Sequence, residues 1–369
     1  MATLQEMLKI AGSIESAEKI ARGLWKSSRD EYGLDYQLAL AAQGKWKEAI
    51  QVNAGLKKDN ARTVYATGLL SIISGNLKHG IYQMHCGRDD SLFGNGTLLP
   101  GNLYDPRVTD LTDKVVLLRS EGGLGDEIIN VRFAKTLKDR GARVIVSCSK
   151  SLQSIFADVD GVDGTVAQED AHLVKYDYWI PGMSAPGMLD VSFDTLPSGA
   201  YLKAKPKFVE KFAEHMGEKS GLRVGIKWVG NPLFEHEQHR RFPLKLLLNA
   251  VKGCDAWSLD IGQPCPEGVK DATPMLQSWD DTLGALSNID LLITSCTSLA
   301  HASAALGKET WVLTPIMPYY VWAYPIESNT SPWYDSVKLY RQQKFGVWDQ
   351  PFAQISKDLA TLNQGVFHG

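Results

Sequence analysis

The chain has 369 residues, of which 44% are hydrophobic and 22% are charged, and its formal net charge is −3. This is the composition of an ordinary globular protein, and at roughly 150 residues per domain its length predicts two or three domains. The slight negative charge argues against nucleic acid as the general partner and leaves room only for a local basic cleft.

The apolar segments and the cysteines favour a cytoplasmic protein without a structural zinc site. The N-terminus lacks the apolar core of a signal peptide, and no segment approaches the roughly 20 apolar residues that span a bilayer. The cysteines are odd in number and scattered, and they form no CxxC pair, which predicts reduced thiols and argues against structural zinc. They are Cys86, Cys148, Cys254, Cys265 and Cys296.

Residues 1–88 are predicted to be all-helical. Two of their segments, 38–50 and 68–81, each predict an apolar helix, a glycine turn and a second helix. Ala49 and Gly80 stand where the two helices of each pair would approach closely. Because the offset is near the ~34 residues of a tetratricopeptide unit, we favour tetratricopeptide-like hairpins, a docking or packing module, over a generic helical bundle.

Residues 89–112 are rich in Gly, Asn, Asp and Pro, which predicts a linker or an ordered loop. In residues 113–218 strands alternate with helices, beginning with a buried parallel strand at Val115–Leu118, a glycine turn and a helix from Asp126. Further strands are predicted at 144–147, 164–166 and 178–180, with a helix at 151–158 and a Pro/Gly loop at 181–186.

Residues 219–369 repeat the alternation of strand and helix. A strand from Arg223 enters a glycine loop at Gly230–Pro232, and a helix begins near Pro243. The further predicted strands are 256–259, 290–294 and 310–314, and the further predicted helices are 281–286 and 298–306. The sequence therefore predicts an α/β protein with two doubly wound, Rossmann-like domains that face each other across a cleft.

Three signals lie at the carboxyl ends of predicted strands, the edge where such sheets bind ligands. They are Gly122–Asp126, Gly230–Pro232 and Cys296–His301. At the first, an acidic residue begins the helix and would repel a pyrophosphate. This turn is therefore expected to present a carboxylate to the cleft, and a nicotinamide oxidoreductase ranks far behind because the last glycine of GxGxxG is missing.

The helix that begins at Thr297 is expected to bind an anion. Its first N–H groups and the positive end of its dipole favour a diphosphate, and the hydroxyls of Thr297 and Ser298 can add hydrogen bonds. The alternative is plain N-capping by Ser295 or Thr297, and both can hold at once.

Several motifs, taken in order, resemble the heptosyltransferase-like glycosyltransferases, especially the branch that carries tetratricopeptide repeats. The likeness covers most of residues 40–360. The matching pieces are Gly123-Leu-Gly-Asp126-Glu, Trp228-Val-Gly-Asn-Pro232, His239-Arg-Arg-Phe-Pro243-Leu, Asp281-Thr282, Thr297-Ser-Leu-Ala-His301 through Lys308, Ser331-Pro-Trp-Tyr334 and Leu339-Tyr-Arg-Gln342.

The resemblance implies a two-domain GT-B architecture and metal-independent transfer, with the donor nucleotide sugar held mainly by the C-terminal domain. The family's catalytic carboxylate falls on Asp126, which also fits a general base on chemical grounds. Glu127 is the alternative base, Glu121 is expected to be structural, and a helix-capping role for Asp126 is the plain alternative. Arg240 matches the family's basic residue before Phe-Pro-Leu and could offset charge on the leaving phosphate, unless it is a solvated surface arginine.

The predicted site therefore has Asp126 and Arg240 as catalytic residues, a nucleoside-diphosphate sugar as co-substrate, and no separate cofactor or metal. Lys227 and Arg241 are alternatives to Arg240, and His301 is a ligand contact or a packing histidine. The predicted donor-binding residues are Gly123, Gly125, Lys227, Asn231, Arg241, Cys296, Thr297, Ser298 and His301.

Two positions depart from the family pattern. Cys296 precedes Thr297 where related enzymes often carry Asp, and a thiol cannot accept two sugar hydroxyls as a carboxylate does. This departure weakens any prediction of ADP-heptose as the donor. Glu309 stands where the family usually has Pro after Gly-Lys, and we expect it to affect only the turn.

The leading hypothesis is an inverting glycosyltransferase whose acceptor is a glycan, a lipid-linked saccharide, a protein side chain or a hydroxymethylated DNA base. The helical N-terminus slightly favours a macromolecular acceptor, and the weak acidity counts mildly against DNA. The second hypothesis is a non-catalytic binding scaffold that joins tetratricopeptide-like helices to an inactive transferase domain. Retention of Asp126, Arg240 and Thr297 argues against the scaffold, and Cys296 argues for it.

Overall fold

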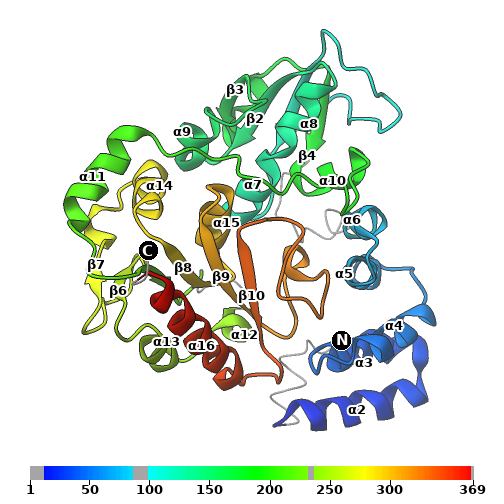
Figure 1. Cartoon of the computed structure of the whole chain (residues 1–369). Coiled ribbons are helices and arrows are strands. Elements are labelled where there is room, and N and C mark those ends of the chain that lie inside the picture. Colours follow the sequence, from blue (N-terminus) through cyan, green and yellow to red (C-terminus); the bar gives the residue numbers. More distant parts are fainter. Residues whose placement is uncertain (1–11, 86–98, 232–236, 367–369) are drawn as a thin grey trace.

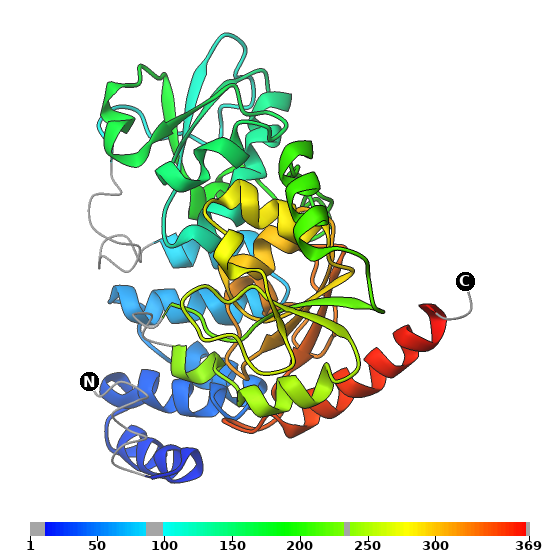
Figure 2. The same cartoon turned by 90° about the vertical axis from the view of Figure 1, so that its left-hand side faces the viewer.

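The computed structural model describes residues 12–85, 99–231 and 237–366. Five consecutive helices, α2 to α6, are followed by two parallel sheets with helices packed around them (Figure 1). Seen from two directions, the helices lie beside the second sheet domain, and α6 reaches the first (Figures 1 and 2). Within the described residues, no helix combines the length and apolar character that crossing a bilayer requires.

The N-terminal segment forms helices at the predicted places. Residues 1–11 and 86–88 of this predicted segment lie outside the described residues. Both predicted hairpins are present, and their turns contain Gly44 and Gly75 at φ values of +70° and +89°, a region that favours glycine. The helices are α2 (Ile14–Ser27), α3 (Arg29–Ala41), α4 (Trp46–Ala54), α5 (Ala61–Ile73) and α6 (Leu77–His85).

The close approach predicted at Gly80 is confirmed. A Cβ atom on Gly80 would lie 2.6 Å from the carbonyl oxygen of Gly68, so α5 and α6 touch through two glycines. Ala49 of α4 is completely buried. The hairpins are thus observed, whereas their assignment to tetratricopeptide repeats stays a prediction.

Residues 99–112 form an ordered loop along the edge of the first sheet, and residues 86–98 lie outside the described residues. The backbone N–H of Trp179 donates to the carbonyl of Asn102, and the N–H of Tyr104 donates to the carbonyl of Trp179, each with an N–O distance of 2.9 Å. Leu103 pairs with Trp179 in parallel fashion. Of the two alternatives for this segment, its described part is therefore an ordered loop.

The first sheet has the strand order β3-β2-β1-β4, and all of its strands are parallel. The order reverses between β1 and β4, because β2 and β3 extend the sheet to one side only. The strands predicted from the sequence are confirmed as β1 (Val115–Arg119), β2 (Arg143–Cys148), β3 (Gly164–Ala167) and β4 (Tyr178–Pro181). Helices α7 (Leu124–Val131) and α8 (Phe133–Asp139) follow β1.

The second sheet has the order β10-β9-β8-β5-β6-β7, again all parallel, and reverses between β5 and β8. Its strands are β5 (Arg223–Lys227), β6 (Asp255–Ser258), β7 (Lys270–Asp271), β8 (Leu291–Ser295), β9 (Glu309–Thr314) and β10 (Val337–Arg341). Strands β7 and β10 were not expected from the sequence. The longer helices here are α13 (Leu244–Ala250), α14 (Trp279–Ser287), α15 (Ser298–Ala305) and α16 (Asp349–Val366).

One connecting helix lies on the second domain although it precedes the predicted boundary at residue 219. This helix, α11 (Pro206–Met216), packs against α14. The domain limits themselves stay a prediction. The remaining short elements are η2 (Lys150–Leu152), α9 (Gln153–Phe156), η3 (Gln168–Leu173), η4 (Gly182–Ser184), α10 (Ala185–Met188), α12 (Glu237–Arg240), η5 (Thr273–Met275) and η6 (Tyr320–Trp322).

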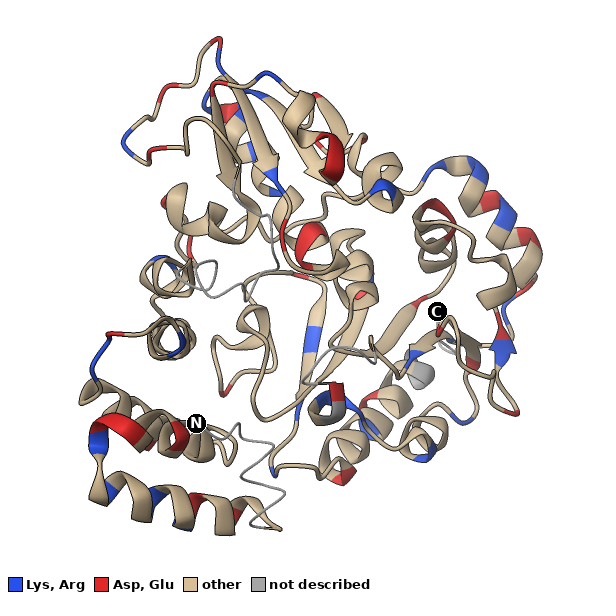
Figure 3. Cartoon of the chain, turned by 180° about the vertical axis from the view of Figure 1, so that it is seen from behind, with Lys and Arg blue, Asp and Glu red and all other residues tan. Residues whose placement is uncertain are grey.

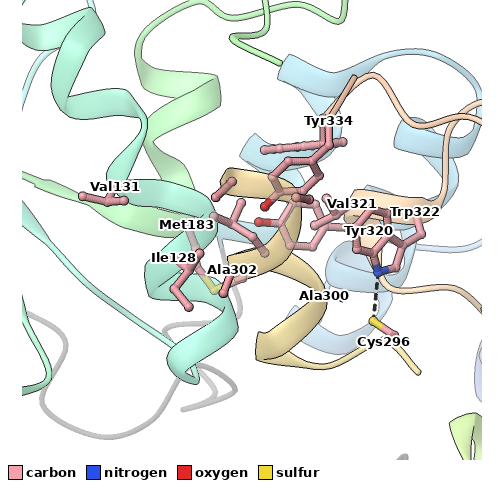
Figure 4. Close-up of a cluster of buried hydrophobic side chains, with 14 of the residues drawn as sticks. Ile128, Val131, Met183, Cys296, Ala300, Ala302, Tyr320, Val321, Trp322 and Tyr334 are labelled. Atoms are coloured by element: carbon pink, nitrogen blue, oxygen red, sulfur yellow. Dashed lines mark hydrogen bonds between the residues drawn. The ribbon is translucent and has the colours of Figure 1, made fainter. Parts of the chain in front are cut away.

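The two sheet domains share one hydrophobic core with the N-terminal helices. At the junction, α7 of the first domain packs directly against α15 of the second. Figure 4 shows Ile128 and Met183 on one side of Ala300 and Ala302 of α15, with Tyr320, Trp322 and Tyr334 on the other. The outer face of the second sheet, covered by α13 and α16, forms a separate cluster.

A buried arginine links the two domains. Arg132 lies between α7 and α8 and is only 2% exposed. Its guanidinium donates to the carbonyls of Pro197, at 2.8 Å, and Trp333, at 2.6 Å, and lies 4.4 Å from the ring centre of Tyr334. The charge is thus solvated by carbonyl oxygens and aromatic faces from both sides of the junction.

Replacing Arg132 by Ala is expected to lower the free energy of unfolding by about 3–5 kcal/mol, because buried carbonyls lose their donors and a cavity remains. Urea unfolding measures the change. Arg107→Ala is the matched control, because that side chain is 90% exposed and should cost less than about 0.5 kcal/mol. Equal stability of the two variants would show that Arg132 does not link the domains.

Candidate active site

In each sheet the strand order reverses at one point, and these two points lie at the junction between the domains. Ligands of parallel sheets bind beyond the carboxyl ends of strands, where the strand order reverses. In the first sheet this point is followed by the turn 120–123, and in the second by the loops 228–231 and 296–297. Because α7 packs against α15, these segments form one candidate site at the domain junction.

Asp126 lies in the first turn of α7 and is held from both domains. One carboxylate oxygen accepts the N–H of Gly123 at 2.8 Å, which caps the helix as the plain alternative foresaw. The other accepts the hydroxyl of Tyr319, from the loop after β9. The side chain is half-buried, so it stands at the surface of the junction.

The surroundings of Asp126 raise its pKa. Burial is the largest cause, and the hydrogen bonds from Tyr319 and Gly123 offset part of the rise. The charge of nearby Glu121 adds to it. A carboxyl whose pKa is shifted upwards is better matched to proton transfer near neutral pH than an ordinary one.

The neighbouring carboxylates have structural partners. Glu127 is 2% exposed and accepts hydrogen bonds from the N–H of Ser149, at 2.8 Å, and from the amide of Gln168, at 3.1 Å. Glu121 is equally buried and accepts the N–H of Met183 at 3.2 Å. These contacts make Asp126 the accessible carboxylate of the turn, and they agree with the structural role expected for Glu121.

The two predicted glycines take different places. Gly123 is exposed at the start of α7, beside the carboxylate of Asp126. Gly125 faces α15, where an added Cβ atom would lie 3.2 Å from the ring of His301 and 3.4 Å from the Cα atom of Ser298. A larger residue at position 125 would therefore press against the start of α15.

The N-terminus of α15 is not capped by a side chain. Thr297 is the N-cap residue, but its hydroxyl faces that of Thr294 at 3.4 Å and accepts no N–H of the helix. Ser298 begins the helix and is partly exposed. Plain capping by Thr297 is therefore not what the structure shows, and the first N–H groups keep their capacity to bind an anion.

Arg240 lies beside this helix start and is not a solvated surface residue. Its side chain is 15% exposed and forms an ion pair with Glu237 at 2.5 Å. It also donates to the carbonyl of Cys296. The Glu237 carboxylate accepts the N–H of Gly230 at 2.7 Å, and a Cβ atom at Gly230 would collide with Arg240. The glycine loop thus lets the guanidinium reach α15.

Cys296 and His301 are bound within the second domain. The Cys296 thiol is buried and accepts the indole N–H of Trp322 at 2.9 Å, and burial raises its pKa to about 11. His301 stacks on the same indole, with 4.9 Å between ring centres, and lies 3.2 Å from the hydroxyl of Tyr334. Burial and the charge of Arg132 lower the pKa of His301 to about 3, so it stays neutral. Its contacts favour packing over ligand binding.

The remaining predicted donor-binding residues surround the loop after β5. Lys227 forms an ion pair with buried Asp260 at 2.5 Å, whose carboxylate also accepts the N–H groups of Trp228 and Val229. Asn231 and Arg241 are exposed. The structure thus gives Lys227 a role in shaping the loop, and the donor contacts of these three residues stay predictions. Residue 232, the end of the predicted Gly230–Pro232 signal, lies outside the described residues.

Three side chains at the junction were not predicted from the sequence. Tyr319 binds Asp126 from 193 residues away, and Trp322 joins Cys296 to His301. Tyr65 of α5 is close enough to raise the pKa of Tyr319, to which burial and Asp126 contribute more. The aromatic density of residues 319–324 is the sequence feature that could have indicated Tyr319 and Trp322, but it says nothing of Tyr65.

In the described part of the chain, no group of three or more His, Cys, Asp or Glu side chains is placed to hold a metal ion.

No family model matches the sequence, and no curated protein matches it. Among solved structures, the chain is similar to a family 9 glycosyl transferase from Veillonella parvula, with 13% identity and a TM-score of 0.49 over 70% of this chain and 90% of that chain.

Two further structures show a similar or weaker likeness. The E. coli ADP-heptose LPS heptosyltransferase II is 12% identical, with a TM-score of 0.47 over 68% of this chain and 98% of that chain. A Thermobaculum terrenum O-GlcNAc transferase mutant is 12% identical, with a TM-score of 0.33 over 99% of this chain and 92% of that chain. Values this low assign no site residue, so the roles proposed below depend on contacts within this chain.

The raised pKa of Asp126 predicts how stability depends on pH. The folded protein holds this proton more tightly than the unfolded chain, so the free energy of unfolding falls as pH rises between the two pKa values. Asp126→Asn removes the titrating carboxyl and therefore this fall in the free energy of unfolding. The variant is therefore expected to gain stability relative to the natural protein as pH rises from 4 towards 8, as measured by urea unfolding.

Asp194→Asn is the control for that series, because Asp194 is exposed. Its difference from the natural protein should stay flat over the same pH range. A flat difference for Asp126→Asn as well would mean that burial does not disfavour the Asp126 charge.

Proposed function

We propose that the protein is an inverting glycosyltransferase that moves a sugar from a nucleoside diphosphate to an acceptor hydroxyl. The observation that carries the proposal is the position of Asp126, a carboxylate with a raised pKa, at the junction with α15, whose N-terminus carries no side-chain cap. A base and an anion site thus come from different domains and meet at the reversal points of both sheets.

Asp126 is the proposed general base. The acceptor oxygen attacks the anomeric carbon, the bond from that carbon to the phosphate oxygen breaks, and Asp126 takes the acceptor proton. In the structure, the Tyr319 hydroxyl donates to this carboxylate. It occupies the position that an acceptor hydroxyl would need, so we propose that the acceptor displaces it.

The start of α15 and Arg240 are the proposed partners of the leaving nucleoside diphosphate. Backbone N–H groups at a helix start stabilise phosphate charge, and Ser298 can add its hydroxyl. Arg240 is fixed beside them through the carbonyl of Cys296. Because these groups supply the positive charge, the proposed transfer needs no metal ion.

The proposed architecture is GT-B, with the acceptor on the first domain and the donor on the second. Lysines, arginines, aspartates and glutamates are intermixed over the described parts of the chain (Figure 3). This mixture supports a glycan or protein acceptor more than a hydroxymethylated DNA base, since phosphate contacts need a basic stripe. The neutral thiol at position 296 favours a donor sugar that is not recognised by a carboxylate there.

A thermal-shift panel of UDP, GDP, ADP, CDP and TDP, with and without magnesium and with NAD as the control, tests the donor site. A ligand at ~100 times its dissociation constant stabilises the native state by roughly 2.7 kcal/mol. We expect one nucleoside diphosphate to stabilise the protein regardless of magnesium. If no nucleoside diphosphate stabilises the protein, the alternative of a non-catalytic binding scaffold is favoured.

Arg240→Ala is expected to weaken binding of that nucleoside diphosphate by about tenfold to a hundredfold, because charge-assisted hydrogen bonds are worth ~1.5–3 kcal/mol. Isothermal titration calorimetry measures the change. Arg241→Ala, at the adjacent exposed arginine that is the alternative for this role, should change affinity less. The reverse order of effects would transfer the role to Arg241.

Asp126→Asn is expected to lower turnover by about 10²–10⁴-fold, the usual contribution of a general base, while nucleoside-diphosphate affinity persists. The release of nucleoside diphosphate from the matching nucleotide sugar, with candidate acceptors present, measures turnover. Retained turnover would remove Asp126 from the mechanism and leave the donor site standing.

A further inference from the structure

A second site lies away from the domain junction. A cavity of about 510 Å³ opens between the α3–α4 turn and the carboxyl ends of β9 and β10. Ligand pockets in proteins range from roughly 300 to 1,000 Å³. We propose that this cavity binds a neutral saccharide, a role that is separate from the nucleotide site and does not depend on the transferase activity.

The lining of the cavity is rich in carboxamides. An amide side chain offers both donors and an acceptor, which matches a sugar hydroxyl that also both donates and accepts. The six amides come from the helical segment, the loop before β10, the end of β10 and the start of α16. They are Gln43, Asn329, Gln342, Gln343, Gln350 and Gln354.

One of these amides has an unused donor. Gln342 is 3% exposed, and its side-chain oxygen accepts the N–H of Ile316 at 3.3 Å. Its side-chain nitrogen has no hydrogen-bond partner among the described residues. A buried donor without an acceptor costs about 1–3 kcal/mol, so a ligand oxygen that reached this nitrogen would offset that cost.

The charged groups that line the cavity are largely engaged elsewhere. The guanidinium of Arg341 donates to the carbonyls of Trp322, at 2.8 Å, and Ser328, at 2.7 Å. The hydroxyl of Tyr340 donates to Asp358 at 2.7 Å. Glu327, the remaining ionisable side chain of the lining, is exposed and negative. A phosphate-bearing ligand would find no available cation here, whereas a neutral one is matched.

Trp46 supplies the apolar surface that a sugar ring needs. It begins α4, lines the cavity and is half-buried against the shared core. The C–H face of a pyranose packs on an indole ring, while its hydroxyls bond to surrounding amides. An indole and several amides in a cavity without an available cation therefore fit a neutral saccharide.

The cavity is distinct from the proposed nucleotide site, yet connected to it along the chain. It lies beyond β9 and β10, not at the reversal point between β5 and β8. Ile316 lines it, and Tyr319, three residues further on, binds Asp126. A saccharide in the cavity would thus rest on the segment that carries Tyr319 to the junction.

Saturation-transfer NMR on the full chain tests the site, with glucose, galactose, N-acetylglucosamine, maltose and lactose as probes and a neutral glycan array for longer chains. We expect at least one neutral saccharide to bind. Trp46→Ala and Gln342→Leu should each weaken binding by about tenfold or more, which corresponds to ~1.4 kcal/mol.

Gln51→Leu is the matched control, because Gln51 is an exposed glutamine on the same helix as Trp46 and does not line the cavity. If Trp46→Ala or Gln342→Leu fails to fold, Trp46→Phe and Gln342→Met replace them. The absence of any saccharide binding, or binding that neither variant changes, would overturn the proposal. Weaker nucleoside-diphosphate binding in Gln342→Leu would also overturn it, by assigning the cavity to the donor.

Failure of this site and failure of the transferase proposal give different results. Stabilisation by a nucleoside diphosphate without any saccharide binding removes the cavity proposal alone. Saccharide binding without any nucleotide effect removes the transferase proposal and leaves the cavity site standing.

Discussion

The contact between α7 and α15 is the constraint on which the candidate site depends. Two helix starts, each carrying positive partial charge, meet where Gly125 lies against Ser298. This arrangement is unfavourable unless negative charge lies nearby. The Asp126 carboxylate caps α7, whereas α15 has no side-chain cap. The fold thus provides one positive end with a carboxylate and leaves the other without a side-chain cap.

The loop after β9 connects this contact to the rest of the molecule. Tyr319 binds Asp126 of the first domain, and Trp322 joins Cys296 to His301 within the second, so this one loop has contacts in both domains. Arg132 also links the two domains, because its guanidinium donates to the carbonyl of Trp333. Because these groups are buried together in one core, the relative position of the two helix starts is set by packing and not by a flexible linker.

Local patterns in the sequence predicted the elements that carry the chemistry. The strand, glycine turn and helix around Asp126, and the helix start at Thr297, follow from residues that are neighbours in the chain. The partners could not be predicted, because they are distant: Tyr319 is 193 residues from Asp126, and Trp333 is 201 residues from Arg132.

Strand β10 and the partner of Lys227 were not predicted, each for a physical reason. The strand β10 mixes apolar and charged residues at the edge of its sheet, so its five residues carry no clear buried-strand pattern. Lys227, the last residue of β5, was expected near the donor, and its ion-pair partner Asp260 lies 33 residues later. Charge alone cannot tell a ligand contact from an ion pair, because both use the same side chain.

Cys296 shows how a departure from a family pattern can preserve a site. A carboxylate at this position would stand next to Arg240, which already pairs with Glu237, and within electrostatic reach of Asp126. It would compete with a diphosphate for the guanidinium and raise the pKa of Asp126 further. The neutral thiol instead accepts the indole N–H of Trp322 and leaves its backbone carbonyl to orient Arg240. In the proposed transferase, a thiol at this position would therefore lack a carboxylate's contact to the sugar, while Arg240 would keep its charge for the leaving diphosphate.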